Sequence, residues 1–450
     1  MNANPVNREK WVVIGGGMLG MAVARKLLDK NGDVTILEAS PKLGGLASAW
    51  SIGNVIWDRF YHVTLLSDHY LRDLLKELEL DDEIDWVVTK TGFYSNGKLH
   101  SLSSSLDFLK FPILNLYQKF RLGSTIFCAS KRSDWDQLED MSVEKWLRKW
   151  SGDSTFEKIW LPLLKSKLGD AYQRTNAAFI WAYIQRMYAA RRSGLKREMF
   201  GIVDGGYNRV LHSFHNMLLN RGAKIVCGAK VTSIQSPSES NETRASKYRV
   251  EYESDTQHET IEADKVVVTL PSGQVSNMPA PLSDQERHLH SNIEYLGVVC
   301  TSLLIEKPLG GYYVTNITDP GFPITGVIEM GAMLPPRKLD GNYLVYLPQY
   351  VHSQSELFEE SDDNIHQRCF NTLERMYPHF SRSEVKSIQT ARARYVMSIP
   401  TLGYSRKRAP VKCESPGLFV LNSARIVDGT LNVNEILRLV DLEFGTLITV

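Results

Sequence analysis

The sequence predicts an α/β fold whose parts are interleaved along the chain, and three observations support this. Strand and helix patterns alternate in three segments, at about 10–57, at about 201–271 and after about residue 417. Leucines spaced i, i+3, i+4 and i+7 from Leu71 open a helix-rich stretch between the first two segments. The chain has 450 residues, 43% of them hydrophobic, which is enough for a large core and predicts two domains.

Charge and cysteine usage exclude several classes of function. The 52 basic and 51 acidic residues nearly cancel, so nucleic acid is not expected as a partner. The five cysteines are scattered and form no C-x-x-C pair, which predicts neither a disulfide framework nor a metal site. Free thiols fit a reducing cytosol, and no apolar run reaches about 18 residues, so we expect a soluble cytoplasmic protein.

The first element is a strand, a turn and a helix. A buried strand, Trp11–Ile14, leads into Gly15-x-Gly17-x-x-Gly20, and an amphipathic helix follows. Gly15 permits a tight turn, Gly17 lets a phosphate approach the backbone, and Gly20 lets the helix pack closely on the strand. The start of the helix then presents unpaired N–H groups to a diphosphate.

A second strand, Val34–Leu37, follows this helix and ends at Glu38. Glu38 lies 18 residues beyond Gly20, where a carboxylate accepts hydrogen bonds from both hydroxyls of a ribose. A carboxylate there also repels a 2′-phosphate, which disfavours NADP. The unit therefore predicts a Rossmann-type dinucleotide-binding domain, and the residues after Glu38 decide between FAD and NAD.

The stretch Pro41–Ser48 carries a basic residue, a hydrophobic residue, two glycines and a serine. It resembles the second glycine motif of the FAD-dependent amine oxidase and protoporphyrinogen oxidase superfamily, whose residues line the diphosphate and the flavin. NAD dehydrogenases usually lack this extension, so the resemblance implies FAD. No cysteine or histidine has flanks typical of covalent attachment, which favours noncovalent FAD.

Two later segments extend the resemblance. In the superfamily, a valine at the position of Val231 packs on the adenine, and a strand like Gly417–Asn422 meets the phosphates. The resemblance also implies that a helix from about Asn432 points its N-terminus at the flavin pyrimidine. The expected cofactor-binding residues are Gly15, Gly16, Gly17, Met18, Leu19, Gly20, Glu38, Ala39, Lys42, Gly44, Gly45, Leu46, Ala47, Ser48, Val231, Asn422 and Val433.

The chain departs from the superfamily pattern in two places. Asn422 and Ser423 stand where relatives have a Gly-Asp pair, and an asparagine still hydrogen-bonds a phosphate or a hydroxyl. In the segment Asp58–His62, Phe60 and Tyr61 replace the two glycines of the pattern D-x-G-G-H. These aromatic residues either form one wall of the site or belong to the ordinary core.

The candidate catalytic residues are His62, Arg59 and Tyr61, which follow the strand nearest the flavin. A histidine there orients a substrate or takes a proton near neutral pH, and a structural histidine is the alternative. Arg59 faces the cofactor or an anionic substrate, or it forms a surface salt bridge. Lys307 is assigned no role because nothing in its flanks identifies one.

The helix-rich stretch leaves the substrate open. Its aromatic residues are either core or the wall of a roomy pocket for a polycyclic or isoprenoid substrate. The basic cluster that follows is either solvated or recognises an anionic substrate. A third alternative is that this cluster docks to an anionic membrane, together with the apolar and basic residues of the segment 108–121. The aromatic residues are Trp146, Trp150, Trp160, Phe179, Trp181, Tyr183 and Tyr188. The basic residues are Arg186, Arg191, Arg192, Lys196 and Arg197.

The resemblance implies a discontinuous architecture. Residues 1–58, 201–280 and 415–450 are expected to form a Rossmann-type FAD-binding domain, and residues 59–200 and 281–414 a mixed α+β substrate domain. The expected activity is that of an FAD-dependent oxidoreductase, which transfers a hydride from an amine or an activated C–H group of a small molecule to flavin N5. Two alternatives stay open: an isomerase or desaturase acting on an isoprenoid or nucleotide-sugar substrate, and a non-catalytic flavin-stabilised binding protein.

Overall fold

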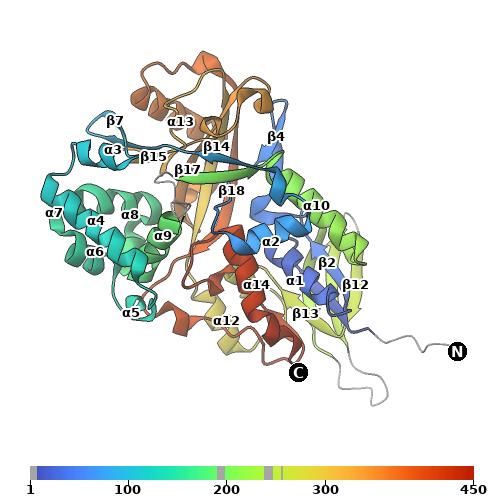
Figure 1. The fold of residues 1–450 in the computed structure, drawn as a ribbon. Coiled ribbons are helices and arrows are strands. Elements are labelled where there is room, and N and C mark those ends of the chain that lie inside the picture. The colour runs from blue at the N-terminus through green and yellow to red at the C-terminus, as the bar shows by residue number, and fades with distance from the viewer. Residues whose placement is uncertain (1–7, 190–197, 238–246, 255–256, 450) are drawn as a thin grey trace.

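A parallel sheet of five strands, in the order β19-β13-β1-β2-β9, forms one part of the molecule. The computed structural model describes residues 8–189, 198–237, 247–254 and 257–449 (Figure 1). The strands are β1 (Lys10–Ile14), β2 (Asp33–Glu38), β9 (Lys224–Cys227), β13 (Lys265–Val268) and β19 (Leu418–Val420). All four strand pairings are parallel, and strands far apart in the sequence alternate with helices, which confirms the predicted α/β class.

Helices from both ends of the chain pack together beside this sheet. The helix α1 (Met18–Leu28) connects β1 to β2, and α14 (Val433–Ile448) lies beside it, although their colours in Figure 1 mark opposite ends of the chain. The helices α2 (His69–Glu77) and α10 (Gly206–Asn220) bury apolar residues in the same core. The helix α2 therefore packs with elements of the expected FAD-binding segments, although it lies outside them in the sequence.

A sheet of seven strands forms the second part, in the order β18-β14-β17-β16-β15-β6-β7. Its strand β14 is buried at all eleven positions, because β17 and β18 flank it and helix α13 packs nearby. The members are β6 (Thr91–Ser95), β7 (Lys98–Ser101), β14 (Tyr295–Ile305), β15 (Val314–Ile317), β16 (Gly326–Glu329), β17 (Tyr343–His352), β18 (Val385–Ser398) and α13 (Asp362–Met376).

Smaller elements join these sheets. A hairpin of β3 (Ala49–Ile52) and β4 (Val55–Asp58) continues from the second glycine motif. The remaining strands are β5 (Ile84–Val88), β8 (Met199–Val203), β10 (Ala229–Gln235), β11 (Tyr248–Ser254) and β12 (Gln257–Ala263). Two short helices, α11 (Ser272–Val275) and α12 (Asp284–Ser291), follow β13.

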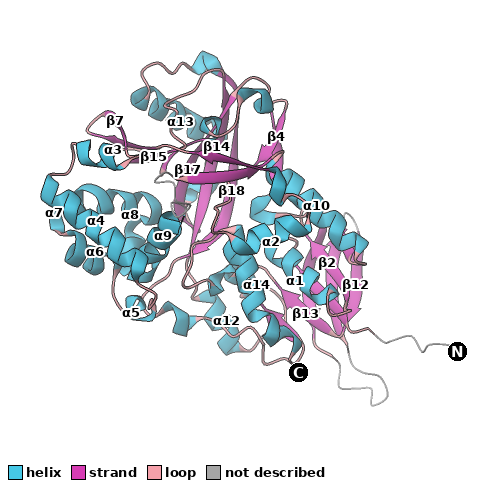
Figure 2. Cartoon of the chain, viewed as in Figure 1, coloured by secondary structure: helices cyan, strands magenta, loops and turns pink. Residues whose placement is uncertain are grey.

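A group of helices lies beside the seven-stranded sheet (Figure 2). They are α3 (Ser105–Lys110), α4 (Leu116–Lys131), α5 (Asp136–Glu139), α6 (Val143–Ser151), α7 (Asp153–Thr155), α8 (Leu161–Leu168) and α9 (Ala177–Ala189). The Ser142 side chain accepts a hydrogen bond from the Lys145 N–H and so caps the start of α6. Of the predicted basic cluster, Arg191, Arg192, Lys196 and Arg197 lie outside the described residues.

Within the described ranges, every helix is too short or too polar to cross a membrane.

Candidate functional site

A large cavity of about 1130 Å³ is lined by residues from both sheets and from the helical group. One set of lining residues comes from the two glycine motifs and the start of α14. The other set comes from α8, α9 and the seven-stranded sheet. The volume exceeds the roughly 300–1,000 Å³ of common ligand pockets, so the cavity has room for a large cofactor and a substrate together.

The two glycine motifs contact each other at the cavity wall. Gly15 has a φ of +103°, which favours glycine, and a Cβ on Gly20 would lie 1.9 Å from the Gly15 carbonyl oxygen. Gly44 pairs with Gly17 in a parallel bridge. A Cβ on Gly45, whose φ is +56°, would lie 3.2 Å from the Gly17 Cα. A larger residue at Gly45 would therefore push the two loops apart.

Unsatisfied polar groups surround these loops. The helix α1 begins after Gly17 with no side chain capping its first N–H groups, and Gly17, Met18 and Leu19 line the cavity. Ser48 Oγ and Arg59 Nε are buried and have no hydrogen-bond partner within the described chain. Both of these side chains lie outside the cavity wall, so the backbone N–H groups at the start of α1 are the donors that fit the diphosphate of a dinucleotide.

Glu38 is held in place by backbone N–H groups. Its Oε2 accepts a hydrogen bond from Gly16 N at 2.6 Å, and its Oε1 accepts one from Ser40 N at 2.8 Å. Each carboxylate oxygen keeps further acceptor capacity, and the side chain lines the cavity. This arrangement fits the two hydroxyls of a ribose.

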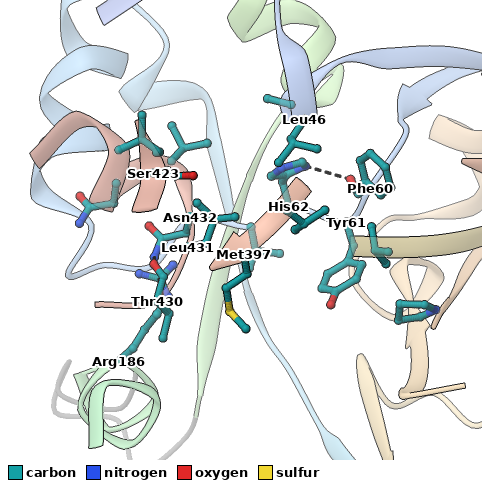
Figure 3. A pocket seen from close by; sticks show the side chains of 18 of the residues that line it. Leu46, Phe60, Tyr61, His62, Arg186, Met397, Ser423, Thr430, Leu431 and Asn432 are labelled. Atoms are coloured by element: carbon teal, nitrogen blue, oxygen red, sulfur yellow. Dashed lines mark hydrogen bonds between the residues drawn. The ribbon is translucent and has the colours of Figure 1, made fainter. Parts of the chain in front are cut away.

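The start of α14 forms the opposite wall. Figure 3 shows Ser423 and the segment Thr430–Asn432 on one side of the cavity, and Leu46 and His62 on the other. Asn432 Oδ1 accepts a hydrogen bond from Glu435 N at 3.1 Å and so begins the helix. The positive end of the helix dipole therefore lies at the cavity, as the resemblance predicts.

Asn422 joins the ends of β13 and β19. Its Nδ2 donates hydrogen bonds to the Leu270 carbonyl at 3.0 Å and to Ser272 Oγ at 3.2 Å, and its Oδ1 accepts one from Ala424 N. Both N–H donors of the amide are thus used within the protein. Ser423, the next residue, also lines the cavity.

His62 and Asp58 lie together at the end of β4. The Phe60 carbonyl is 2.9 Å from His62 Nδ1, and because a carbonyl only accepts, Nδ1 carries the hydrogen and Nε2 is left as an acceptor. Burial lowers the pKa of His62 to about 4. Asp58 Oδ1 accepts a hydrogen bond from Tyr207 N at 2.8 Å, and burial raises the pKa of the Asp58 carboxyl to about 8. His62 is consequently a neutral acceptor at pH 7.

The aromatic residues of this segment have two roles. Phe60 and Tyr61 pack against the core between the hairpin and the seven-stranded sheet, and both also line the cavity. Phe60 and Tyr61 are therefore part of the core and also part of the cavity wall. Tyr61 Oη lies 2.9 Å from Tyr350 Oη.

Not every predicted residue reaches the cavity wall. Gly16 and Gly20 have packing roles within the first motif, Arg59 lies over the Trp50 ring at 5.6 Å, and Val231 packs in the core around β10–β12. The predicted residues outside the wall are Gly16, Gly20, Ala39, Lys42, Ser48, Arg59 and Val231. Those in the wall are Gly15, Gly17, Met18, Leu19, Glu38, Gly44, Gly45, Leu46, Ala47, Tyr61, His62, Asn422 and Val433.

The helical aromatic residues divide between core and wall. Trp160, Phe179, Tyr183 and Tyr188 line the cavity. In contrast, Trp146 and Trp181 are buried in the helical core, and Trp150 is 42% exposed.

Sequence reasoning missed Lys167 and Tyr350 in the wall. Lys167 follows Leu164 by three residues and therefore lies on the apolar face of α8. A lysine at an apolar position of a helix is the sequence signal that could have identified it. Lys307, which was assigned no role, forms an ion pair with Glu384.

Comparisons with known proteins agree with this geometry. The family model described as "Flavin containing amine oxidoreductase" matches residues 19–430. Protoporphyrinogen oxidase 1 of Arabidopsis thaliana is 23% identical over 74% of this chain and 68% of its own length. Zeta-carotene desaturase of a Synechocystis species is 23% identical over 68% of this chain and 66% of its own length. The match thus spans about two thirds of the length of each of these two relatives.

A solved structure of putrescine oxidase bound to putrescine superposes with a TM-score of 0.71 at 16% identity, over 98% of this chain and 99% of the other. All five cysteines are free thiols, and none of them lines the cavity, which agrees with noncovalent binding of FAD. The chain therefore belongs to the flavin containing amine oxidoreductase family and is an FAD-dependent oxidoreductase.

Proposed function

We propose that this enzyme oxidises a bulky, mainly apolar substrate at a C–H bond rather than a small cationic amine. The observation that carries this proposal is the chemistry of the cavity wall. Aliphatic and aromatic residues dominate the part contributed by α8, α9 and the seven-stranded sheet, including Leu163, Ile180, Tyr183, Val298 and Ile328. Bound flavin supplies the hydride acceptor, and the protein positions the substrate against it.

The acidic residues of the wall already have partners, which disfavours a diamine. Asp68 accepts hydrogen bonds from Arg186 at 2.6 and 3.0 Å. Glu198 accepts one from Thr91 Oγ1 at 3.1 Å, and Glu38 accepts two from backbone N–H groups. A buried ammonium group requires a carboxylate of its own, because an unpaired buried charge is costly.

The residues in the wall then have the following roles. The glycine motifs and the start of α1 bind the diphosphate, Glu38 binds the ribose, and the N-terminus of α14 with Val433 stabilises negative charge on the flavin. A pKa of about 4 makes His62 too weak a base to take a proton from the substrate. His62 instead accepts a hydrogen bond through Nε2 and so orients the substrate. Tyr61 forms the adjoining wall.

The division of the chain into domains is part of the proposal. The FAD-binding domain comprises 1–58, 201–280 and 415–450, and the substrate domain comprises 59–200 and 281–414. All strands of the parallel sheet come from the first set of segments, and all strands of the seven-stranded sheet come from the second.

Anaerobic mixing tests the proposed reaction. FAD-loaded protein is mixed with protoporphyrinogen IX, zeta-carotene or putrescine, and the oxidised flavin absorbance is followed. We expect reduction by one of the two bulky compounds and none by putrescine, and reduction by putrescine would refute the proposal. Turnover only after pre-reduction would identify an isomerase, and inertness toward all three compounds would indicate a binding protein.

The exposed surface of α3 and α4 fits an anionic membrane, and we assign it as a docking face. Its apolar residues are Leu106, Leu109, Leu116, Tyr117, Phe120 and Phe127, each at least 55% exposed. Residues 108–133 contain no Asp or Glu. Of their five basic residues, Lys119 is buried and donates to the Leu109 carbonyl. The other four form no ion pair with a carboxylate of the described chain: Lys110, Arg121, Lys131 and Arg132.

Apolar side chains beside uncompensated positive charge favour anionic lipid over a protein partner of mixed charge. Ile126, on the same helix α4, lines the cavity. The docking face therefore lies on an element that also forms the substrate pocket, as suits a lipid-soluble substrate.

A further inference from the structure

Lys167 is the exception among the charged residues of the cavity wall. Its Nζ lies 3.0 Å from the centroid of the Tyr350 ring, and it forms no ion pair with a carboxylate of the described chain. The other charged groups there have partners, since Arg186 binds Asp68 and Arg394 binds Glu359. Burial alone lowers the pKa of Lys167 well below its usual range. Lys167 thus lies in the wall without an anionic partner, and a bound anion would favour its protonated, charged form.

The backbone around Lys167 is fixed. Ser166 Oγ donates to the Thr325 carbonyl at 3.2 Å, and Thr325 Oγ1 donates to the Ser166 carbonyl at 2.9 Å. These reciprocal bonds attach α8 to the segment before β16. The position of Lys167 is therefore set before any ligand binds, which lowers the entropic cost of binding.

A second donor lies beside this lysine. The hydroxyls of Tyr61 and Tyr350 lie 2.9 Å apart, so one of them donates to the other. The hydroxyl that accepts keeps its own hydrogen, for which the described chain offers no further acceptor. Burial raises the pKa of both phenols, so they remain donors at pH 7.

We propose that Lys167 and the Tyr61–Tyr350 hydroxyl pair bind a carboxylate of the substrate, which makes the substrate a bulky apolar acid. One ammonium group balances one carboxylate charge, and the N–H and O–H donors supply partners for its two oxygens. This inference rests on the proposed function, because it places an acidic end on the same apolar substrate. A phosphate monoester is less suitable, since its second charge would remain uncompensated.

Ligand binding to the oxidised, FAD-loaded protein tests this without turnover. The probes are lauric acid, lauryl alcohol and laurylamine, and calorimetry and perturbation of the flavin spectrum measure their affinities. We expect the acid to bind about 10–100-fold more tightly than the alcohol, the range for a hydrogen bond to a charged group. Tighter binding of the amine than of the acid would overturn the proposal.

Variants on one helix provide the matched comparison. Lys167→Met should weaken binding of the acid about 10–100-fold and leave binding of the alcohol unchanged. Lys165→Met makes the same substitution at an exposed lysine of α8 and should change neither affinity. Tyr350→Phe removes only the hydroxyl, and it should weaken binding of the acid even if Lys167→Met fails to fold.

The outcomes separate this inference from the proposed function. Unchanged binding of the acid to a folded Lys167→Met protein with full FAD content refutes the carboxylate site and leaves the redox proposal standing. Selective binding of the acid that depends on Lys167, together with flavin reduction by putrescine alone, refutes the redox proposal and supports the anion site.

Discussion

At the residue scale, the neighbours Asp58 and His62 have pKa values displaced in opposite directions. Both side chains are buried at the end of β4, and burial disfavours the charged form of each. The result is a pair that is neutral near pH 7, although the sequence alone suggests a carboxylate beside a titrating histidine. The consequence is a pH dependence of stability that belongs mainly to Asp58 above about pH 6.5.

The sign of this dependence follows from proton binding. Folded Asp58 keeps its proton up to a pKa of about 8, whereas the unfolded carboxyl loses it near 3.8. The unfolded state therefore binds fewer protons in this interval, and stability falls as pH rises. We expect roughly 2 kcal/mol to be lost between about pH 6.5 and about pH 8.5.

Asp58→Asn should remove this loss while keeping the acceptor for Tyr207 N. Thermal unfolding at a series of pH values should show the melting temperature of the variant rising relative to wild type as pH increases. Asp170→Asn, at an exposed position, serves as the control and should show no such trend. A constant difference across the series for Asp58→Asn would contradict the raised pKa.

At the element scale, the two glycine loops act as one unit. Each is a short turn, and Gly44 pairs with Gly17 across them, while a Cβ on Gly45 would lie 3.2 Å from the Gly17 Cα. The sequence predicted this unit well because every signal lies within a few residues of the next. A strand, three spaced glycines, a helix and an acid occur within residues 11–38.

Gly45→Val should separate the loops and weaken FAD binding at least about tenfold, because a side chain there meets the Gly17 Cα and strains the backbone. The FAD-to-protein ratio after purification and a fluorescence titration measure the effect. Gly97→Val is a matched control, since Gly97 also has a positive φ, of +69°, but has open space around it. Equal loss of FAD in both variants would show that strain alone, and not contact between the loops, is responsible.

At the scale of the whole molecule, the residues that line the substrate part of the cavity could not be predicted from the sequence, for a physical reason. Tyr61 and Tyr350 are 289 residues apart, and the packing of the segment after β4 against strand β17 brings them together. No local pattern encodes such a contact, because sheet register depends on the packing of the entire sheet. Lys167 was missed for the same reason, because it lies on helix α8 and its neighbour Tyr350 lies on strand β17.

The docking face of α3 and α4 predicts an orientation of the whole molecule on a membrane. We expect sedimentation with vesicles of phosphatidylcholine and phosphatidylserine, and little with phosphatidylcholine alone. Phe120→Glu should reduce binding at least about tenfold, because it replaces an inserted apolar side chain by a charge. Leu442→Glu, at a 63% exposed position on α14, should bind as wild type does. Equal binding of Phe120→Glu and wild type would refute the docking face.

The strand β19 and the helix α14 complete a cavity that begins with β1. During translation, the first glycine motif leaves the ribosome some 400 residues before these partners, since β19 starts at Leu418. Until then the FAD-binding site of the nascent chain is incomplete, and an unpaired strand edge is exposed. Such an edge binds chaperones or aggregates. Cofactor loading is consequently a late event in biogenesis, and flavin starvation should leave folding intermediates that proteases remove.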